Sequence, residues 1–301
     1  MPELPEVTTT VTGLNTVLQK LSITDVWTDY FVNTLSTRTD TIKNKKYFES
    51  FKKEIVGEKF VLAERRGKNV LIHISHNKTI LIHMKMTGHL LYGTYFFDET
   101  GTKWKSYEKL LSDPFNQFVH LIFTLSNGKH LAFSDMRKFA KVFMFHTDNR
   151  GTVTDLAGLG PEPLDNMSLE TFSTQLKTKI KGKIKTVLMD QTVVAGIGNI
   201  YSDEILWESS VNPERTISTL TPAEIKKMWS ATTKILTSGI DLGGDSMSDY
   251  RNIYGERGGF QNSHKAYRRS KEPCLRRGCP GVIVRKVIGG RSAHFCPVHQ
   301  K

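Results

Sequence analysis

The stretch DQTVVAGIGNIYSDEILW, residues 190–207, decides how the second half of the chain is expected to fold. One helical run precedes Asp190, and a second begins at Asn199 and should end near Asn212-Pro213. The two are joined by a connection that contains glycine. With Asn199 as N-cap, unpaired backbone N–H groups and the helix dipole would favour a phosphate at that point. The alternative interpretation is an ordinary helical hairpin with a glycine turn.

A further helix is predicted downstream of this stretch. Thr221-Pro222-Ala223-Glu224 has the form of a capping box with proline at the first helical position. The residues expected to form its buried face are Ile225, Met228, Trp229 and Leu236.

The first half of the chain has the period of β-strands. NVLIHI and TILIHM are apolar at every second residue, and Asn127-Gly128 lies between two apolar runs, which predicts a hairpin. We expect an antiparallel β-sandwich or flattened barrel over residues 1–148, interrupted by a long irregular excursion over residues 93–117. A leading helix should bury Val7, Val11, Leu14 and Leu18, which are spaced by four, three and four residues.

Charge is concentrated at the end of the chain. The formal net charge is +12, and residues 265–301 carry ten Lys/Arg against the single acid Glu272, a local net of +9. This basic tail favours a polyanion partner, with nucleic acid ahead of an anionic lipid surface because the charges do not form one polar helix face. The length favours two or three domains, and the absence of a membrane-length apolar run or a signal pattern predicts a soluble, cytoplasmic protein.

The three cysteines also lie in the tail, where Cys274, Cys279, Cys296 and His299 form the pattern C-x4-C-x16-C-x2-H. Three thiolates and one imidazole make a tetrahedral set of the kind that holds a structural Zn²⁺. The intervening sequence predicts a β-hairpin that turns at Gly289-Gly290. Because so small a segment has almost no core, the metal would supply much of its folding free energy. The alternative is three buried structural cysteines and a surface histidine.

The chain start, MPELPEV, offers a possible nucleophile. Met1 is normally removed before a residue as small as Pro2, which would leave a secondary amine with the carboxyl group of Glu3 beside it. The simpler interpretation is an arm whose Pro2 and Pro5 delay a helix. Met86, Arg137 and Phe139 present a similar choice, because Met and Phe at strand ends usually belong to a core but can also fill the gap left by a flipped base.

Taken together, these segments resemble the bacterial formamidopyrimidine-DNA glycosylase family, with endonuclease VIII-type glycosylases as close relatives. The matching segments are PELPEV, ERRGKNVL, HMKMTG, DMRKF, LGPEPL, IKTVLMDQTVVAGIGNIYSDE and the terminal hairpin ending in CPVHQK. The resemblance implies an α+β fold with a catalytic β-sandwich domain (1–148), a helix–two-turn–helix domain (149–262) and a zinc β-hairpin (263–301).

The resemblance also implies roles for individual residues. Pro2 would be the nucleophile, Glu3 the general acid/base and Lys68 a lysine at a hairpin tip that contacts phosphate near the lesion. Met86, Arg137 and Phe139 match the intercalating set, and Glu6 would line the lesion pocket. Lys185, Asn199 and Arg291 match DNA-phosphate contacts. The chain departs from the family pattern in the zinc ligands, which are usually C-x2-C at the first pair and Cys at the last, and in a long insertion over residues 91–118.

The activity implied is that of a bifunctional glycosylase and AP lyase in base excision repair. Its partner would be double-stranded DNA with oxidised bases or abasic sites, bound by a monomer at the nucleoid. Two alternatives stay open: a preference for oxidised pyrimidines, and a non-catalytic zinc-dependent protein that binds damaged DNA.

Overall fold

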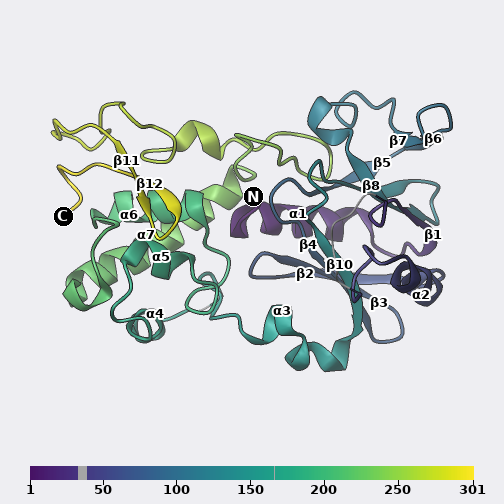
Figure 1. The fold of residues 1–301 in the computed structure, drawn as a ribbon, viewed down its shortest axis with the longest axis horizontal. Helices are drawn as coiled ribbons and strands as arrows, with labels where there is room; N and C mark the ends of the chain where they lie inside the picture. Colours follow the sequence, from purple (N-terminus) through teal and green to yellow (C-terminus); the bar gives the residue numbers. More distant parts are fainter. Residues whose placement is uncertain (33–38, 166) are drawn as a thin grey trace. The chain divides into compact units, whose positions relative to one another are not determined.

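A computed structural model describes residues 1–32, 39–165 and 167–301 (Figure 1). The chain forms two compact units. Unit 1 contains residues 1–153 together with 243–259, and unit 2 contains residues 154–242 together with 260–301. The segment 243–259 therefore belongs to the β-rich unit, although it follows the helices in sequence. The three-domain division expected from the sequence stays a prediction.

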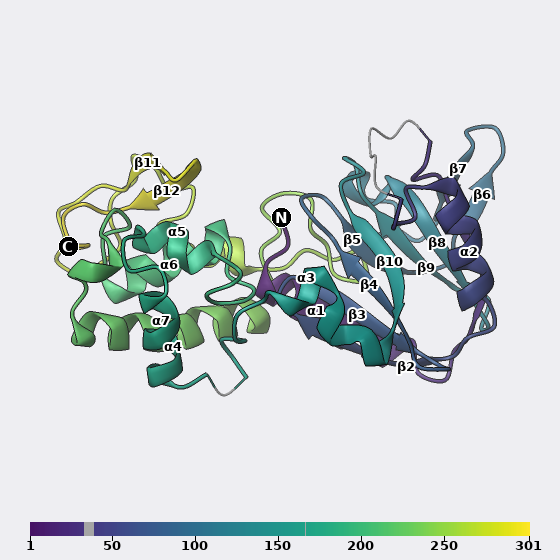
Figure 2. The same cartoon turned by 60° about the horizontal axis from the view of Figure 1, so that its bottom comes forward.

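Unit 1 is built on two antiparallel four-stranded sheets, seen within the unit in Figure 2. The first has the order β1-β8-β9-β5 and the second the order β10-β4-β3-β2. The strands are β1 (Ile23–Thr28), β2 (Phe60–Arg66), β3 (Asn69–Ile74), β4 (Lys78–His83), β5 (His89–Gly93), β8 (Val119–Leu125), β9 (His130–Ser134) and β10 (Lys141–His146). Two separate sheets define a β-sandwich rather than a flattened barrel.

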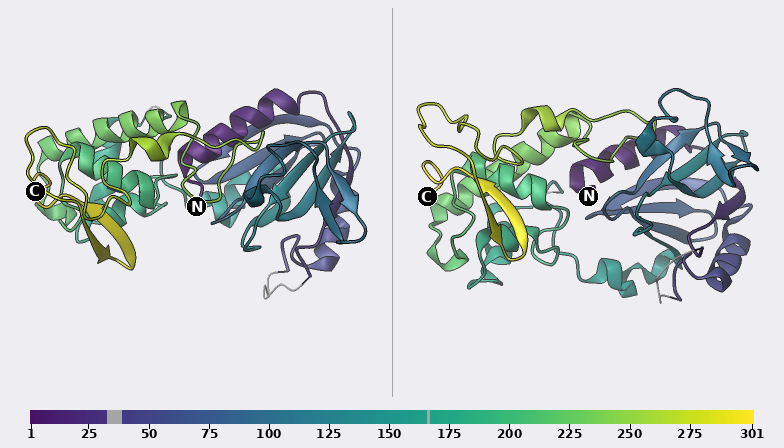
Figure 3. Two further views of the ribbon diagram at one scale, coloured as in Figure 1. Left: turned by 90° about the horizontal axis from the view of Figure 1, so that it is seen from above. Right: turned by 45° about the horizontal axis from the view of Figure 1, so that its top comes forward.

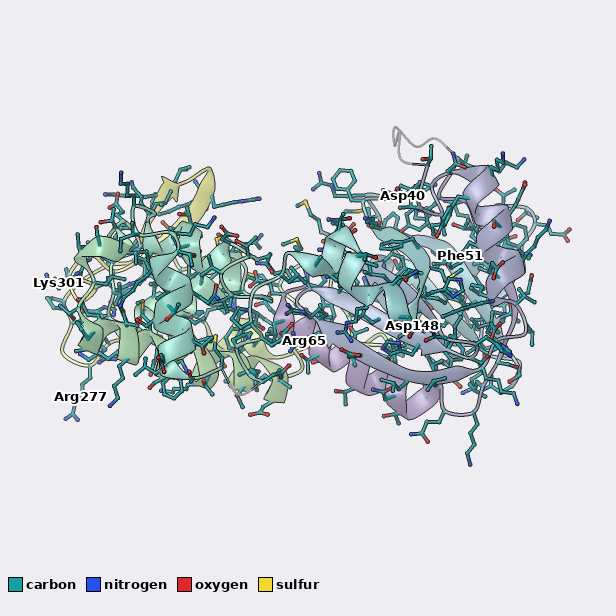
Figure 4. The ribbon with its side chains drawn as sticks, turned by 90° about the horizontal axis from the view of Figure 1, so that it is seen from below. Asp40, Phe51, Arg65, Asp148, Arg277 and Lys301 are labelled. Carbon is teal, nitrogen blue, oxygen red and sulfur yellow. The ribbon has the colours of Figure 1, made fainter. Side chains whose placement is uncertain are left out.

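One apolar core fills the space between the sheets. Side chains from both sheets contribute to it, among them Val70 and Ile82 from one sheet and Leu121 from the other. Helix α1 (Leu4–Val17) also contributes, and its predicted face of Val7, Val11 and Leu14, with Leu18 just beyond the helix, is buried as expected. Helix α2 (Lys45–Ile55) adds Phe51, which is labelled in Figure 4.

The predicted hairpins have turn geometries that explain their sequences. His76 and Asn77 join β3 to β4 with φ values of 55° and 59°, and Gly128 follows Asn127 between β8 and β9 with φ of 78°. Positive φ values of this kind match the right-handed twist of the flanking strands and favour Asn and Gly.

The excursion at residues 93–117 is more regular than expected. It forms a small hairpin of β6 (Phe96–Asp98) and β7 (Lys103–Lys105), followed by a 3₁₀ turn, η1 (Pro114–Asn116). Phe97 and Trp104 are cross-strand partners, and both rings lie against Trp27 of β1. The insertion thus covers the outer face of the first sheet, where a second apolar cluster consists of Leu91, Tyr95, Leu111, Val119, Ile122 and Ala132.

Unit 2 is helical and ends in a β-hairpin. Its elements, with the turn that leads into it, are η2 (Thr147–Thr152), α3 (Thr154–Ala157), α4 (Leu169–Lys177), α5 (Ile184–Met189), α6 (Asn199–Ser209), η3 (Ile217–Thr219), α7 (Pro222–Asp241), η4 (Phe260–Ser263), β11 (Val284–Ile288) and β12 (Arg291–Phe295). Figure 3 shows the yellow hairpin beside the green helices, and β12 packs on α6.

The helix ends of unit 2 confirm one prediction and correct another. Thr221 and Glu224 form the expected capping box at α7. At α6, however, Gly198 is the N-cap and Asn199 is the first helical residue, because the chain enters the helix through the extended backbone of Gly198. Ser210 ends α6 in the left-handed conformation, with φ of 61°. In the part of the chain that the structure describes, no helix has both the length and the hydropathy to span a bilayer.

Candidate active site and metal cluster

The chain start is tied into the first turn of α1. Pro2 and Glu3 are buried, and Glu3 is the N-cap of the helix. The backbone N–H of Glu3 donates to Oε2 of Glu6 at 2.7 Å, and the carboxylate of Glu3 accepts from the backbone N–H of Glu6. This reciprocal pair fixes the residue that follows Pro2 at the positive end of the helix dipole.

Glu6 also holds the segment 243–259 within unit 1. Its Oε1 accepts from the backbone N–H of Asp245 at 2.7 Å, and its carbonyl oxygen accepts from the hydroxyl of Tyr250 at 3.0 Å. Gly244 has φ of +85°, and a Cβ there would lie 2.9 Å from the Glu6 side chain. Glycine is therefore required at this close approach. The residue predicted to line a lesion pocket thus anchors the loop next to the chain start.

Lys68 lies where the sequence placed it, in the turn between β2 and β3. Gly67 precedes it with φ of 56°, which a tight hairpin turn requires. The Lys68 side chain is largely buried. Helix α1 packs against these two strands, and Asn15 of the helix exchanges two hydrogen bonds with the backbone of Ala63 at 2.7 and 2.9 Å. The helix that carries the chain start and the strands that carry the Lys68 turn therefore pack directly on each other.

The predicted intercalating residues are brought together by two turns at strand ends. Met86 is 45% exposed and Phe139 is 47% exposed. Between them, Nη1 of Arg137 lies 3.2 Å from the Met86 sulfur, and its guanidinium lies 4.3 Å from the centre of the Phe139 ring. Large apolar side chains held at the surface beside a cation are unusual for a core and suit insertion into a base stack.

In unit 2, the predicted phosphate contact Lys185 lies in the interior. Its side chain is 0% exposed, and its ammonium donates to the Asn199 carbonyl at 2.9 Å, to Ser202 Oγ at 2.7 Å and to Asp203 Oδ1 at 2.7 Å. A contact between Lys185 and phosphate stays a prediction, and in this structure the lysine instead supports the first turn of α6. Asn199 is half-buried at that turn, and its Oδ1 has no hydrogen-bond partner among the described residues.

Arg291 is exposed at the start of β12, directly after the predicted turn. Gly289 and Gly290 have φ values of 56° and 74°, the geometry of a two-residue hairpin turn. The base of the hairpin is fixed to α6, because Oδ2 of Asp203 accepts from the backbone N–H of His294 at 3.0 Å and lies 3.0 Å from its Nδ1. One carboxylate thus connects the hairpin with the buried Lys185.

The four predicted metal ligands converge. The donor atoms of Cys274, Cys279, Cys296 and His299 all lie within 4.8 Å of one another. Nδ1 of His299 lies 3.2 Å from the Cys274 sulfur, and the Cys279 and Cys296 sulfurs are 3.6 Å apart. Tetrahedral coordination with metal–sulfur bonds of about 2.3 Å requires sulfur atoms spaced by slightly less than 4 Å. The set could therefore hold a metal ion despite the unusual C-x4-C spacing.

Neighbouring groups prepare His299 for this position. Its Nε2–H donates to the Trp207 carbonyl at 3.1 Å, which leaves Nδ1 as the ligating atom. Burial lowers the pKa of His299, so the neutral imidazole that binds metal is favoured.

Among the described residues, three of the most deeply buried acids had no part in the expectations from the sequence. They are Asp203, Glu204 and Asp135, each at most 1% exposed. Glu204 accepts backbone N–H bonds from residues 265–267 at 2.8–3.0 Å and so fixes the segment that leads to the metal cluster. The sequence did hold a signal for two of these acids, because Asp203 and Glu204 lie within an apolar helical run. Acids at such positions are expected to be buried, and buried acids normally have dedicated hydrogen-bond partners.

Comparison with known proteins assigns the class from two consecutive domains. Residues 1–142 match the formamidopyrimidine-DNA glycosylase N-terminal domain, and residues 159–251 match the formamidopyrimidine-DNA glycosylase H2TH domain. Among solved structures, the Lactococcus lactis Fpg in complex with DNA containing an abasic site has a TM-score of 0.82 at 30% identity, over 99% of each chain. A Lactococcus lactis Fpg mutant with DNA containing Fapy-dG also gives 0.82 at 30% identity, over 100% of each chain.

Curated relatives match along the whole chain. Formamidopyrimidine-DNA glycosylase of Pelotomaculum thermopropionicum is 35% identical over 301 residues, covering 100% of this chain and 99% of the relative. That of Bacillus cereus strain ATCC 14579 is 33% identical over 300 residues, covering 100% and 99%. The chain belongs to the formamidopyrimidine-DNA glycosylase family.

Proposed function

We propose that this protein is a bifunctional DNA glycosylase and AP lyase of base excision repair that removes oxidised purines such as 8-oxoguanine and formamidopyrimidines. The observation that carries the proposal is the construction of the chain start. Pro2 and Glu3 are buried at the first turn of α1, and Glu6 joins that turn to the loop at Asp245. A flexible arm would need none of these contacts.

In the proposed reaction, the nitrogen of Pro2 attacks C1′ of the damaged nucleotide after Met1 has been removed. The glycosidic C–N bond breaks, the base leaves, and opening of the sugar ring gives an iminium ion. This cation acidifies the C2′ hydrogen, so the 3′ phosphate is lost by β-elimination and the 5′ phosphate by δ-elimination. Glu3 transfers protons at the sugar oxygen and at C2′.

A chain terminus suits this role because the attacking amine must be neutral. An α-amino group of pKa about 7.8 is neutral about one time in seven at pH 7, whereas a lysine of pKa about 10.4 is neutral about once in 2,500. The difference corresponds to about 3.5 kcal/mol, which is an upper bound because the ring nitrogen of proline is more basic.

DNA binding is proposed to use both units. Met86 and Phe139 would fill the gap left by the flipped nucleotide while Arg137 meets the unpaired base, and Glu6 would line the lesion pocket. Phosphate contacts are assigned to Lys68, to Asn199 at the start of α6, to Arg291 on the hairpin and, if it leaves its interior site, to Lys185. The exposed basic side chains of the tail, such as Arg277 (Figure 4), favour the same partner.

Zn²⁺ is the metal proposed for the cluster, since three cysteines and one histidine form a closed structural donor set. The ion would take no part in the reaction. Its role would be to hold the hairpin that carries Arg291, because the apolar cluster here is small and consists of Trp207, Ala266, Cys274, Ile283 and Cys296. We propose that the protein acts as a monomer, which sedimentation would test.

Borohydride trapping on an 8-oxoguanine duplex tests the proposal. Wild type should form a covalent adduct, Pro2→Gly and Glu3→Gln should form far less, and Glu49→Gln, the same change at an exposed residue of α2, should behave as wild type. Intact-mass spectrometry must find Met1 absent. If wild type lacking Met1 binds the duplex but never cross-links, the protein is a damage-binding protein and not an enzyme. Faster trapping on an oxidised pyrimidine would transfer the specificity to the endonuclease VIII type.

A further inference from the structure

A buried carboxylate lies behind the two turns that carry the intercalating residues. Asp135 is 0% exposed, and its backbone N–H donates to the Phe118 carbonyl at 2.8 Å. It precedes Arg137 and Phe139 in sequence but is buried, whereas Phe139 is 47% exposed. Burying a carboxylate is costly unless it accepts hydrogen bonds from nearby donors, so a carboxylate at this position requires dedicated donors.

Two of the donors to this carboxylate come from the two turns, one from each. Oγ1 of Thr87, the residue after Met86, donates to Oδ1 of Asp135 at 2.5 Å. The backbone N–H of Ala140, the residue after Phe139, donates to Oδ2 at 2.9 Å. The backbone N–H of Arg137 donates in turn to Oγ1 of Thr87 at 3.2 Å. One carboxylate and one hydroxyl therefore connect the Met86 turn to the Arg137–Phe139 turn.

Both turns have backbones that need such support. Lys85 and Lys138 adopt positive φ values of 55° and 50°, which are unfavourable for residues with a Cβ. The turn at Lys138 is closed by a bond from its N–H to the Asp135 carbonyl at 3.0 Å. At the first turn, a Cβ on Gly88 would lie 2.4 Å from the Met84 carbonyl, so the backbones approach too closely for any other residue.

We infer that Asp135 is a positioning residue that sets the spacing of Met86, Arg137 and Phe139, and so governs insertion into the lesion-containing duplex; this inference rests on the proposed function. Asp135 touches no DNA in this role. It acts by joining two turns that belong to different parts of the chain, so the three side chains enter the base stack as one unit. Prior organisation of this kind lowers the ordering cost of binding.

The structure offers a matched set of variants. Asp135→Asn keeps the shape but replaces one acceptor oxygen by a donor. Thr87→Val keeps the volume and removes the hydroxyl that links the turns. Tyr30→Phe is the control, because the Tyr30 hydroxyl donates to the same Oδ2 at 2.9 Å and is equally buried, yet Tyr30 belongs to neither turn.

The first measurement compares two substrates. Excision of 8-oxoguanine from a duplex requires insertion, whereas cleavage of a single-stranded abasic oligonucleotide does not. Asp135→Asn and Thr87→Val should lower the first rate at least tenfold and the second less than twofold, and Tyr30→Phe should change neither more than twofold. Equal losses on both substrates, or an equal loss in Tyr30→Phe, would show that the cluster only stabilises the fold and would overturn the inference.

The second measurement is independent of chemistry. With 2-aminopurine opposite the lesion and Glu3→Gln as the background, insertion should raise fluorescence when the complex forms. Adding Asp135→Asn or Thr87→Val should reduce that rise, and adding Tyr30→Phe should not. If wild type neither cleaves nor cross-links, the proposed activity fails while this fluorescence still decides the inference. An unchanged rise in Asp135→Asn and Thr87→Val would refute it.

Discussion

Replacing Lys185 by methionine distinguishes two roles for a lysine that the family resemblance assigns to a DNA contact and the structure places in the interior. Both Lys185 and Asp203 have side chains that are 0% exposed, with 2.7 Å between Nζ and Oδ1. At an effective dielectric constant of about 20, the Coulomb attraction at that distance is about 6 kcal/mol, and desolvation of the two ions offsets much of it.

Among the described residues, the substitution leaves the buried Asp203 with the backbone N–H and Nδ1 of His294 and removes the Lys185 ammonium. Removing one partner of a buried ion pair costs about 3–5 kcal/mol. We therefore expect Lys185→Met to lower the opening free energy of α5 and α6 by about that amount, measured by native-state hydrogen exchange. Asp203→Asn in the same background should recover part of the loss, since it removes the unpaired charge.

The control is Lys234→Met. Lys234 pairs with Glu208 in the same unit, but its side chain is 67% exposed. A pair so open to solvent contributes less than about 1 kcal/mol. DNA binding tests the other role, a direct contact with phosphate. In a plot of the logarithm of the binding constant against the logarithm of the salt concentration, losing one phosphate contact makes the slope shallower by about 0.9. If Lys185→Met costs under 1 kcal/mol and lowers that slope by about one, Lys185 contacts DNA and the interior assignment is wrong.

Three other predictions concern the metal, pH and the hairpin turn. His299→Ala should lose bound zinc and weaken DNA binding together, while His299→Cys should keep both, as measured by metal analysis and filter binding; full activity in metal-free protein would contradict this. Hydrogen bonding from His73, followed by the ion pair with Arg150, holds the pKa of Glu64 at about 2. The carboxylate therefore stabilises the fold above its unfolded pKa of about 4.3, by about 1 kcal/mol after allowance for its 36% exposure, and this is lost as pH falls toward 2. The stability deficit of Glu64→Gln should shrink over that range in urea titrations, and a deficit independent of pH would exclude the ion pair as its source. Gly290→Ala should destabilise the hairpin by about 1–2 kcal/mol, because the φ of +74° at this position is unfavourable for a residue with a Cβ. A Cβ added at Gly289 would also lie 2.3 Å from Thr186, so Gly289→Ala should destabilise the hairpin more. Hydrogen exchange of β11 and β12 should show the larger loss in Gly289→Ala, and the reverse order would mean that the turn has another geometry.

The features that could be predicted from sequence are those with local causes. The face of α1, the Asn127-Gly128 hairpin, the capping box at Thr221 and the Gly289-Gly290 turn all depend on residues a few positions apart. The metal cluster could also be predicted from the sequence, because ligands that bind one ion must lie close together in the fold.

The features that could not be predicted depend on contacts between distant residues. Alternation of apolar residues shows which face of a strand is buried but not which strand lies beside it, so the pairing of β1 with β8 was not foreseen. The packing of the insertion on the outer face of the first sheet was not predicted for the same reason, because it depends on contacts between residues that are distant in sequence. The interior position of Lys185 was not foreseen, because only the fold places Asp203 against it.

The return of residues 243–259 to unit 1 limits how the protein can be divided. The chain passes from one unit to the other at 153/154, at 242/243 and at 259/260. A fragment that stops at residue 153 would lack the backbone N–H of Asp245, which donates a hydrogen bond to Glu6. It would also lack the Ile253 side chain, which lies against Gly13. Neither half can therefore be exchanged between homologues by a single crossover, and chimaeras would have to carry the loop together with the chain start.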